Sequence, residues 1–158
     1  IKECLELAAK GATESVKHLG TYILSKSDLE DTVVFTNGCF DILHIGHLKL
    51  LRHARSLGNK LIVAINSDAS VKRLKGETRP INSQEIRKET LEQLGIVDEV
   101  IIFDEDTPYE TIKKIKPNII VKGGDYTVET VVGNDLAEVA IFPKVKGYST
   151  TNIIKASK

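Results

Sequence analysis

Five short runs of continuous apolar residues, separated by helical patterns, restrict the folds that this chain can adopt. The runs lie at residues 32–36, 60–66, 99–103, 118–122 and 138–142, and their centres read VVF, LIVAI, VIIF, IIV and VAIF. Continuous rather than alternating apolar residues are typical of strands that are covered on both faces, as in parallel sheets. We therefore expect an α/β fold with a parallel sheet of about five strands and helices on both of its faces.

The segments between these runs carry helical patterns. Residues 45–57 place apolar side chains on one face, and residues 82–94 open with Asn82 and Glu85 at the spacing of a capping box. Residues 108–115 begin with proline, which is common at the start of a helix. Strands that alternate with helices indicate βαβ units with right-handed crossovers, and ligands of such folds bind beyond the C-terminal ends of the strands.

The composition is that of an ordinary globular protein. Of the 158 residues, 41% are apolar, and 22 Lys and Arg offset 22 Asp and Glu. A formal charge of zero gives no support to a nucleic-acid partner or a membrane surface, and the apolar runs of about five residues are far shorter than a bilayer span. The two cysteines, Cys4 and Cys39, predict no disulfide framework, so we expect a cytoplasmic protein.

The first 30 residues differ from the rest, and we expect two parts, residues 1–30 and 31–158. An apolar stripe repeats at helical spacing through Ile1, Leu5, Ala8, Ala12, Val16 and Leu19. The chain contains no methionine and starts at Ile1, which indicates that residues are missing upstream. We expect this stripe to pair with a second copy, which would make the protein a homo-oligomer.

The strongest chemical signal is the segment 36–47, TNGCFDILHIGH, which follows the first expected strand and enters the first expected helix. Its Asn-Gly pair is a turn signal that lets the backbone approach a ligand. His44 and His47 share a face at the helix start, where N–H groups and the dipole attract an anion. Two imidazoles there can donate hydrogen bonds to phosphate, and Gly46 leaves room for it. The pattern therefore predicts phosphoryl-transfer chemistry.

Other interpretations of these residues are weaker. Cys39, His44 and His47 have spacing that a zinc site could use, but no fourth ligand is spaced nearby, so we expect no metal site and interpret Cys39 as a small core or turn residue. The chain has neither a P-loop nor a G-x-G-x-x-G motif. No nucleophile with an adjacent base is evident, which favours direct displacement over a covalent intermediate.

The His-x-Gly-His segment, together with Ser149-Thr150-Thr151 near the end of the chain, resembles the nucleotidyltransferase superfamily that includes the cytidylyltransferases and class I aminoacyl-tRNA synthetases. This resemblance implies a Rossmann-like nucleotidyltransferase fold. In the cytidylyltransferase-like branch, the Ser-Thr-Thr at the start of the last helix contacts the triphosphate. Small hydroxyls at a helix N-cap suit that task.

Further segments narrow the resemblance to the heptose-1-phosphate adenylyltransferases, the second activity of bifunctional ADP-heptose synthases. These segments are 66–71, 73–76 with 79–82, 105–108, 121–126 and the STTNII end. The family's reaction joins ATP and D-glycero-β-D-manno-heptose 1-phosphate to give ADP-heptose, for lipopolysaccharide, and pyrophosphate, with Mg²⁺ on the triphosphate. Residues 7–22 resemble the closing helix of a ribokinase-type sugar kinase, which implies an upstream kinase domain.

The resemblance also implies roles for individual residues. Catalysis is expected from His44 and His47, which would stabilise the pentavalent phosphorus, with assistance from Lys75 or Lys72, both of which are expected in a loop. The nucleotide-binding positions implied are Thr36, Asn37, Gly38, Cys39, Phe40, Asp41, Gly46, Lys72, Arg87, Lys122, Gly124, Asp125, Ser149, Thr150 and Thr151.

Some of these positions have plainer interpretations. Lys122 to Asp125 could be a simple strand-ending turn, and Arg79 and Arg87 could be surface charges. Lys144 and Lys146 stand where cytidylyltransferases often carry an arginine. For the whole chain, the alternatives are a glycerol-3-phosphate cytidylyltransferase or a nucleotide-binding module without turnover. The intact His-Gly-His and Ser-Thr-Thr motifs argue against the last.

Overall fold

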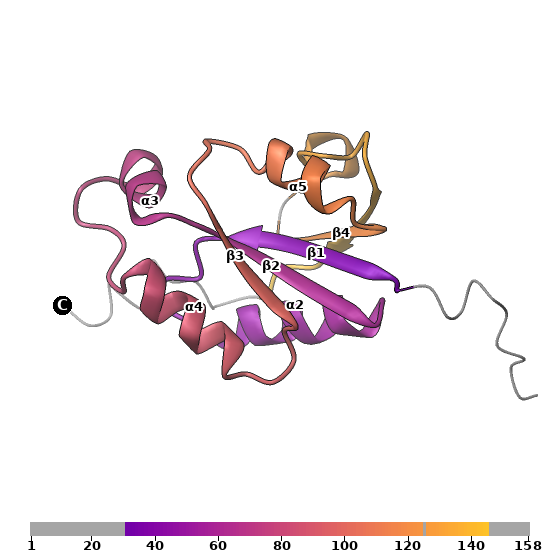
Figure 1. Ribbon diagram of the computed structural model, residues 1–158, viewed down its shortest axis with the longest axis horizontal. Coiled ribbons are helices and arrows are strands. Elements are labelled where there is room, and N and C mark those ends of the chain that lie inside the picture. Colours follow the sequence, from indigo (N-terminus) through magenta and orange to yellow (C-terminus); the bar gives the residue numbers. More distant parts are fainter. Residues whose placement is uncertain (1–30, 125, 146–158) are drawn as a thin grey trace, which may run out of the picture. The chain divides into compact units, whose positions relative to one another are not determined.

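The computed structural model describes residues 31–124 and 126–145. Within them, five strands form one parallel sheet in the order β3-β2-β1-β4-β5 (Figure 1). The strands are β1 (Val33–Gly38), β2 (Lys60–Asn66), β3 (Glu99–Phe103), β4 (Ile119–Gly123) and β5 (Glu138–Phe142). The parallel five-stranded sheet predicted from the apolar runs is confirmed.

Helices cover both faces of the sheet, which explains why the strands are apolar without alternation. The helices α2 (Ile45–Ser56) and α4 (Gln84–Glu92) lie on one face, and α5 (Tyr109–Ile115) lies on the other (Figure 1). Side chains from α2 and α4 join β1 and β2 in one core cluster, which includes Leu51 and Leu91. A second cluster joins α5 to the opposite face.

The strand order places a topological switch at the centre of the sheet. The chain runs outward from β1 through β2 to β3, and then returns through α5 to β4 on the other side of β1. Right-handed crossovers in opposite directions put their helices on opposite faces, so a crevice opens between them. The crevice lies beyond the C-terminal ends of β1 and β4, where a ligand site is expected.

Lys72 and Lys75, which were expected in a loop, instead lie in helix α3 (Asp68–Lys75), and this is a correction. The Ser67 side chain caps the helix by accepting from the backbone N–H of Ser70. Asp68 in the first turn and basic side chains in the last turn suit the helix dipole. Lys75 is therefore held at a helix end rather than on a loop.

The capping prediction for the next helix was also wrong by one residue. Helix α4 is capped by Ser83, whose side chain accepts from the backbone N–H of Ile86. The Asn82 amide instead donates to the backbone carbonyl of Asp41, 2.6 Å away.

A 3₁₀ turn, η2 (Val128–Thr130), follows β4 and was not predicted. Among the described residues, no helix is long and apolar enough to cross a membrane.

Candidate functional site

A cavity of about 590 Å³ opens at the switch point of the sheet. It draws described residues from the end of β1, the start of α2, the end of α3, the loop before α5, the end of β4 and the chain after β5. The predicted site residues that line it are Asn37, Gly38, Cys39, Phe40, His44, Gly46, His47, Lys75, Lys122 and Gly124. The structure thus brings together residues that are far apart in the sequence.

His44 is the N-cap of α2 and has a fixed orientation. Its Nδ1 accepts a hydrogen bond from the backbone N–H of Gly46 over 3.2 Å, so the neutral ring carries its proton on Nε2. A side chain at position 46 would place its Cβ 3.0 Å from two atoms of the His44 ring. A side chain at this position would crowd the ring, so glycine allows the ring to lie against the backbone.

The two imidazoles form a stacked pair at the start of α2. The ring centroids of His44 and His47 are 3.8 Å apart, with 20° between the planes. Burial, followed by the nearby His44 and Lys75 charges, lowers the pKa of His47 to about 4, and burial also lowers the pKa of His44. Both rings are consequently neutral near pH 7 in the free protein.

The turn before α2 occurs at Phe40 rather than at the predicted Asn-Gly pair. Strand β1 continues through Asn37 and Gly38, and Phe40 takes the left-handed φ of 47°. The Phe40 ring is buried, and its centroid lies 5.0 Å from that of His47. This unusual backbone conformation places the Phe40 ring against the His47 imidazole.

Lys122 reaches the cavity from β4. Its Nζ donates to the backbone carbonyl of Asn37 at 3.2 Å and lies 5.3 Å from the centroid of the Tyr126 ring. Within residues 31–124 and 126–145, no ion pair joins it to a carboxylate. Burial lowers the pKa of Lys122 to about 8, so the amine is still charged at neutral pH. A cation in this setting suits an anionic ligand.

The two lysines of α3 differ in their position relative to the cavity. Lys75 lines the cavity at the end of α3, whereas Lys72 is not among the lining residues. Helix α3 is tied to the loop before α5 by Arg73, whose Nε donates to Asp106 at 3.3 Å and whose guanidinium also contacts Asp104. These contacts set the position of Lys75 relative to the cavity.

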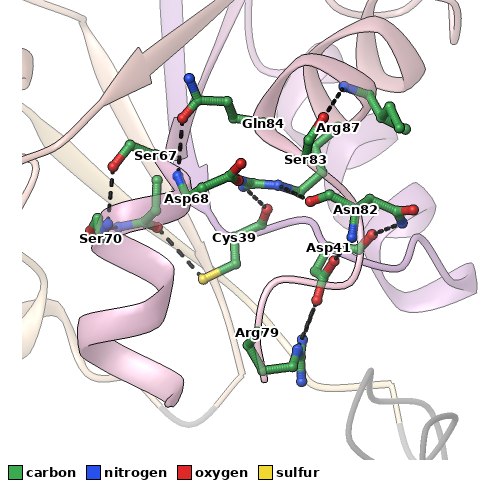
Figure 2. Close-up of polar contacts among 12 residues, drawn as sticks. Cys39, Asp41, Ser67, Asp68, Ser70, Arg79, Asn82, Ser83, Gln84 and Arg87 are labelled. Carbon is green, nitrogen blue, oxygen red and sulfur yellow. Dashed lines mark hydrogen bonds and ion pairs between the residues drawn. The ribbon is translucent and has the colours of Figure 1, made fainter. Parts of the chain in front are cut away.

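Three predicted nucleotide-binding residues, Thr36, Asp41 and Arg87, are buried and are not among the described residues that line the cavity. The carboxylate of Asp41 accepts from the backbone N–H groups of Ile81 and Asn82 and pairs with Arg79 (Figure 2). Burial works to raise the pKa of Asp41, but the hydrogen bonds from Asn82, Ile81 and Arg79 outweigh it and hold the pKa low.

Other predicted residues lie outside the described part of the chain. They are Asp125, Ser149, Thr150 and Thr151, and the expectations for residues 1–30 fall outside it too. The sequence analysis gave no site role to Leu50, Phe103, Thr130, Val132, Phe142, Pro143 and Val145, which also line the cavity. The lining further includes Asn66, Leu74, Asp106, Thr107, Pro108, Gly123 and Tyr126, which it named within the segments that carry the resemblance, and Lys144, which it placed where the family often has an arginine. Several of these directly follow strand ends, so the rule that ligands bind there could have identified them.

The described donors do not form a resident metal cage. Among the described lining residues, Asp106 is the single carboxylate, and it is paired with Arg73. No group of three or more His, Cys, Asp or Glu suited to a metal occurs in the described ranges. The Cys39 thiol lies 3.7 Å from Oδ1 of Asn66. The lining also includes His44, His47, Lys75 and Lys122, side chains that can bind an anion.

Comparison with known proteins gives one family. The cytidylyltransferase-like family matches residues 35–157. The chain is 62% identical over 127 residues to the bifunctional protein HldE of Campylobacter concisus, an alignment that covers 80% of this chain and 27% of that protein. It is 57% identical over 129 residues to the bifunctional protein HldE of Aliarcobacter butzleri, covering 81% and 27%. The chain spans about a quarter of the length of the curated relatives it matches.

Solved structures agree on the fold. The lipopolysaccharide core biosynthesis protein of Thermoplasma volcanium superimposes with a TM-score of 0.61 at 30% identity, over 76% of this chain and all of that one. Pantothenate synthetase of Thermus thermophilus superimposes with a TM-score of 0.57 at 16% identity, over 77% of this chain and 61% of that one. The second likeness shows the fold alone.

Proposed function

The chain belongs to the cytidylyltransferase-like family, and from that premise we propose that it is a heptose-1-phosphate adenylyltransferase. It would transfer AMP from ATP to D-glycero-β-D-manno-heptose 1-phosphate, releasing pyrophosphate and ADP-heptose. The observation that carries this proposal is a cavity at the switch point of the sheet in which His44, His47, Lys75 and Lys122 converge. Its identity of 62% to a bifunctional protein HldE supports the choice of acceptor.

The reaction is a direct displacement at phosphorus. An oxygen of the sugar phosphate attacks the α-phosphorus of ATP in line, and the bond from that phosphorus to the β-phosphate oxygen breaks, so the electron pair leaves with pyrophosphate. Such a transfer depends mainly on positioning and on stabilising charge at the non-bridging oxygens. The stacked His44 and His47 at the N-terminus of α2 supply hydrogen-bond donors for those oxygens.

Substrate binding changes the charge of the histidine pair in this mechanism. Without ligand, burial keeps His47 neutral, with a pKa of about 4. A triphosphate beside the rings reverses that preference, because a nearby negative charge stabilises the protonated imidazole. The proton that His47 takes up then opposes the charge that develops on the α-phosphate oxygens.

Lining residues from β1 and from the end of β4 hold the rest of the nucleotide in this proposal. Lys122 provides a cation, and Gly124 has a φ of 100°, which glycine adopts without strain, so the backbone can approach the ligand. Oδ1 of Asn37 is buried and accepts no hydrogen bond from the described residues, so a donor on the ligand can satisfy it. We assign Asp125 and Ser149 to Thr151 to the same nucleotide site from the motif resemblance.

Mg²⁺ enters with ATP as part of the substrate in this proposal. It neutralises phosphate charge, a role that needs no resident cage of protein carboxylates. We also propose that the chain operates in the cytoplasm, where ATP is available, alongside a sugar kinase domain that precedes it in the full-length protein.

Pyrophosphate release with a panel of nucleotides and phosphorylated acceptors tests the proposal. ATP with heptose 1-phosphate should give the highest kcat/KM. A preference for CTP with glycerol 3-phosphate would move the assignment to a cytidylyltransferase of the same family. Nucleotide binding without pyrophosphate release from any pair would instead identify a binding module.

A further inference from the structure

We infer that Arg87 is a positioning residue: it holds the loop between β1 and α2 in the conformation that orients His47, and it touches neither substrate. This inference rests on the proposed role of His47 in nucleotidyl transfer. It replaces the direct phosphate contact that the sequence predicted for Arg87.

The guanidinium of Arg87 joins three separate segments behind the cavity (Figure 2). It donates to the carboxylate of Asp68 at 2.7 Å, to the backbone carbonyl of Cys39 at 2.8 Å and to the backbone carbonyl of Asn82 at 3.1 Å. The side chain has no exposed surface. The N-terminus of α3, the loop after β1 and the entry to α4 are thereby fixed to one rigid group.

Arg87 contacts Cys39 directly before the residue of the loop that has an unfavourable backbone conformation. The next residue, Phe40, has a φ of 47°, a conformation that a bulky side chain rarely adopts unless its surroundings impose it. Arg87 holds the carbonyl before Phe40, and the hydrogen bonds to Asp41 from Ile81 and Asn82 hold the residue after it. The strained residue is therefore clamped on both sides.

Phe40 transmits this constraint to the imidazole pair. Its ring packs against His47, whose own ring stacks on His44. If the Cys39 carbonyl loses its donor, Phe40 can relax toward ordinary backbone angles and the support beneath His47 is lost. Small misplacements of a catalytic group reduce the rate strongly, so we expect the effect to fall on kcat.

The contacts of Arg87 also argue against a role in binding phosphate. A phosphate-binding arginine presents its planar fork to the ligand, whereas this fork faces one carboxylate and two carbonyls of the protein. Arg87 is not among the residues that line the cavity. Its charge is already neutralised by Asp68, 2.7 Å away.

The test compares Arg87→Gln and Arg87→Lys with Arg55→Gln in the full chain. Arg55 also pairs with an aspartate, Asp98, but its 3.2 Å contact is exposed, lies at the C-terminal end of α2 and is outside the cavity lining. We expect Arg87→Gln to lower kcat about tenfold or more, while KM for ATP stays within about threefold. Arg87→Lys keeps the charge without the fork, so it should recover part of kcat. Arg55→Gln should leave both constants unchanged.

A second readout needs no substrate, so it separates this inference from the proposed function. NMR titration of labelled histidine follows the His47 imidazole, assigned by its loss in His47→Gln. Loosening the loop should expose the ring and move its pKa upward from about 4 toward the ordinary value of 6.5 in Arg87→Gln. A merely structural arginine, like Arg55, should leave this titration unchanged.

Two results would overturn the inference. One is a rise of tenfold or more in KM for ATP with unchanged kcat, which would show that Arg87 binds the nucleotide. The other is an unchanged His47 titration in Arg87→Gln. If circular dichroism shows that Arg87→Gln does not fold, Asp68→Asn decides instead, because it removes the carboxylate that orients the guanidinium. The same upward move of the His47 pKa is then expected, and its absence would reject the inference.

Discussion

Lys122 and Arg87 are two cations withdrawn from solvent, and their surroundings give them opposite roles. Arg87 lies behind the β1–α2 loop, where a carboxylate and two carbonyls accept its hydrogen bonds. Lys122 lies in the cavity wall, where one carbonyl and one aromatic ring are its neighbours. Burial with a matched anion fixes structure, whereas burial with no carboxylate partner among the described residues prepares a site for an anionic ligand.

The same contrast applies to the groups around each of them. The network behind the loop pairs Asp41 with Arg79 and Asp68 with Arg87. In the cavity, burial, followed by the charges of His44 and Lys75, lowers the pKa of His47. The free protein therefore keeps these rings neutral near pH 7, because charging them there is unfavourable. In the proposed function, the negative charge of an entering triphosphate offsets that cost.

The largest expected effect on activity comes from removing a hydrogen-bond donor from the cavity group, by which we mean His44, His47 and Lys75. His47→Ala should lower kcat by about 10²–10³ with the fold intact, because a hydrogen-bond donor to the transition state is lost. Pyrophosphate release measures kcat, and circular dichroism checks the fold. His53→Ala, on the same helix but outside the cavity lining, serves as the control. A kcat within about threefold of wild type in His47→Ala would contradict the assignment.

The cation in the cavity wall should act on binding. Lys122→Met should raise KM for ATP about tenfold or more, because a charged hydrogen bond to phosphate is lost. In the wild type, KM should also rise between pH 7 and 9 as Lys122, with a pKa of about 8, loses its charge. The variant should lack that rise. Lys113→Met, on the exposed side of α5, is the matched control, and equal effects of both variants would remove Lys122 from the site.

Acid should destabilise the protein through the cavity group. Because the pKa of His47 is about 4 when folded and about 6.5 when unfolded, the unfolded chain takes up the proton first as the pH falls. The free energy of unfolding should therefore drop below pH 6.5, with a His47 contribution of about 2 kcal/mol at pH 5. Urea unfolding at pH 7 and 5 measures it. His47→Gln should show a smaller drop than wild type, and an equal drop in both would contradict the prediction.

The smallest effect on activity should come from residues that belong to neither group. Deleting the residues before Ser25 should leave kcat and KM within about twofold, because the described residues that line the cavity begin at Asn37 and those of the network begin at Cys39. We propose that the apolar stripe of this segment pairs two copies, so the solution mass should shift toward monomer. A large loss of kcat in a truncated protein that still folds would show instead that the segment belongs to the active unit.

The sheet could be predicted from the sequence because its signals are local. In β2, every residue from Leu61 to Asn66 is buried, and that is what a continuous apolar run records. Helix α3 was missed for the opposite reason. Its sequence, DASVKRLK, is short and polar, and only Ser70 and Val71 are buried, so no apolar periodicity marks it.

The candidate site likewise has residues that the sequence could predict and residues whose role it could not. The motif at 36–47 identified the histidine pair because spacing on a helix start is a local property. The role of Arg87 was beyond reach, because its partners Cys39 and Asp68 are 48 and 19 positions away. Residue type indicates a charge, but only the fold shows which groups neutralise it. The conformation of Phe40 is likewise imposed by distant contacts and not by its own preference.

The central position of β1 determines when, during synthesis of the chain, the site can be completed. Strand β1 pairs with β2 early in the chain, but its other neighbour, β4, begins only at Ile119. The contact from Lys122 to Asn37 closes a separation of 85 residues. Pairing across such a distance must overcome the entropy of closing the intervening chain. On the ribosome, the histidine motif therefore leaves the exit tunnel long before the strand that completes its cavity, and the growing chain has no finished site until β4 follows.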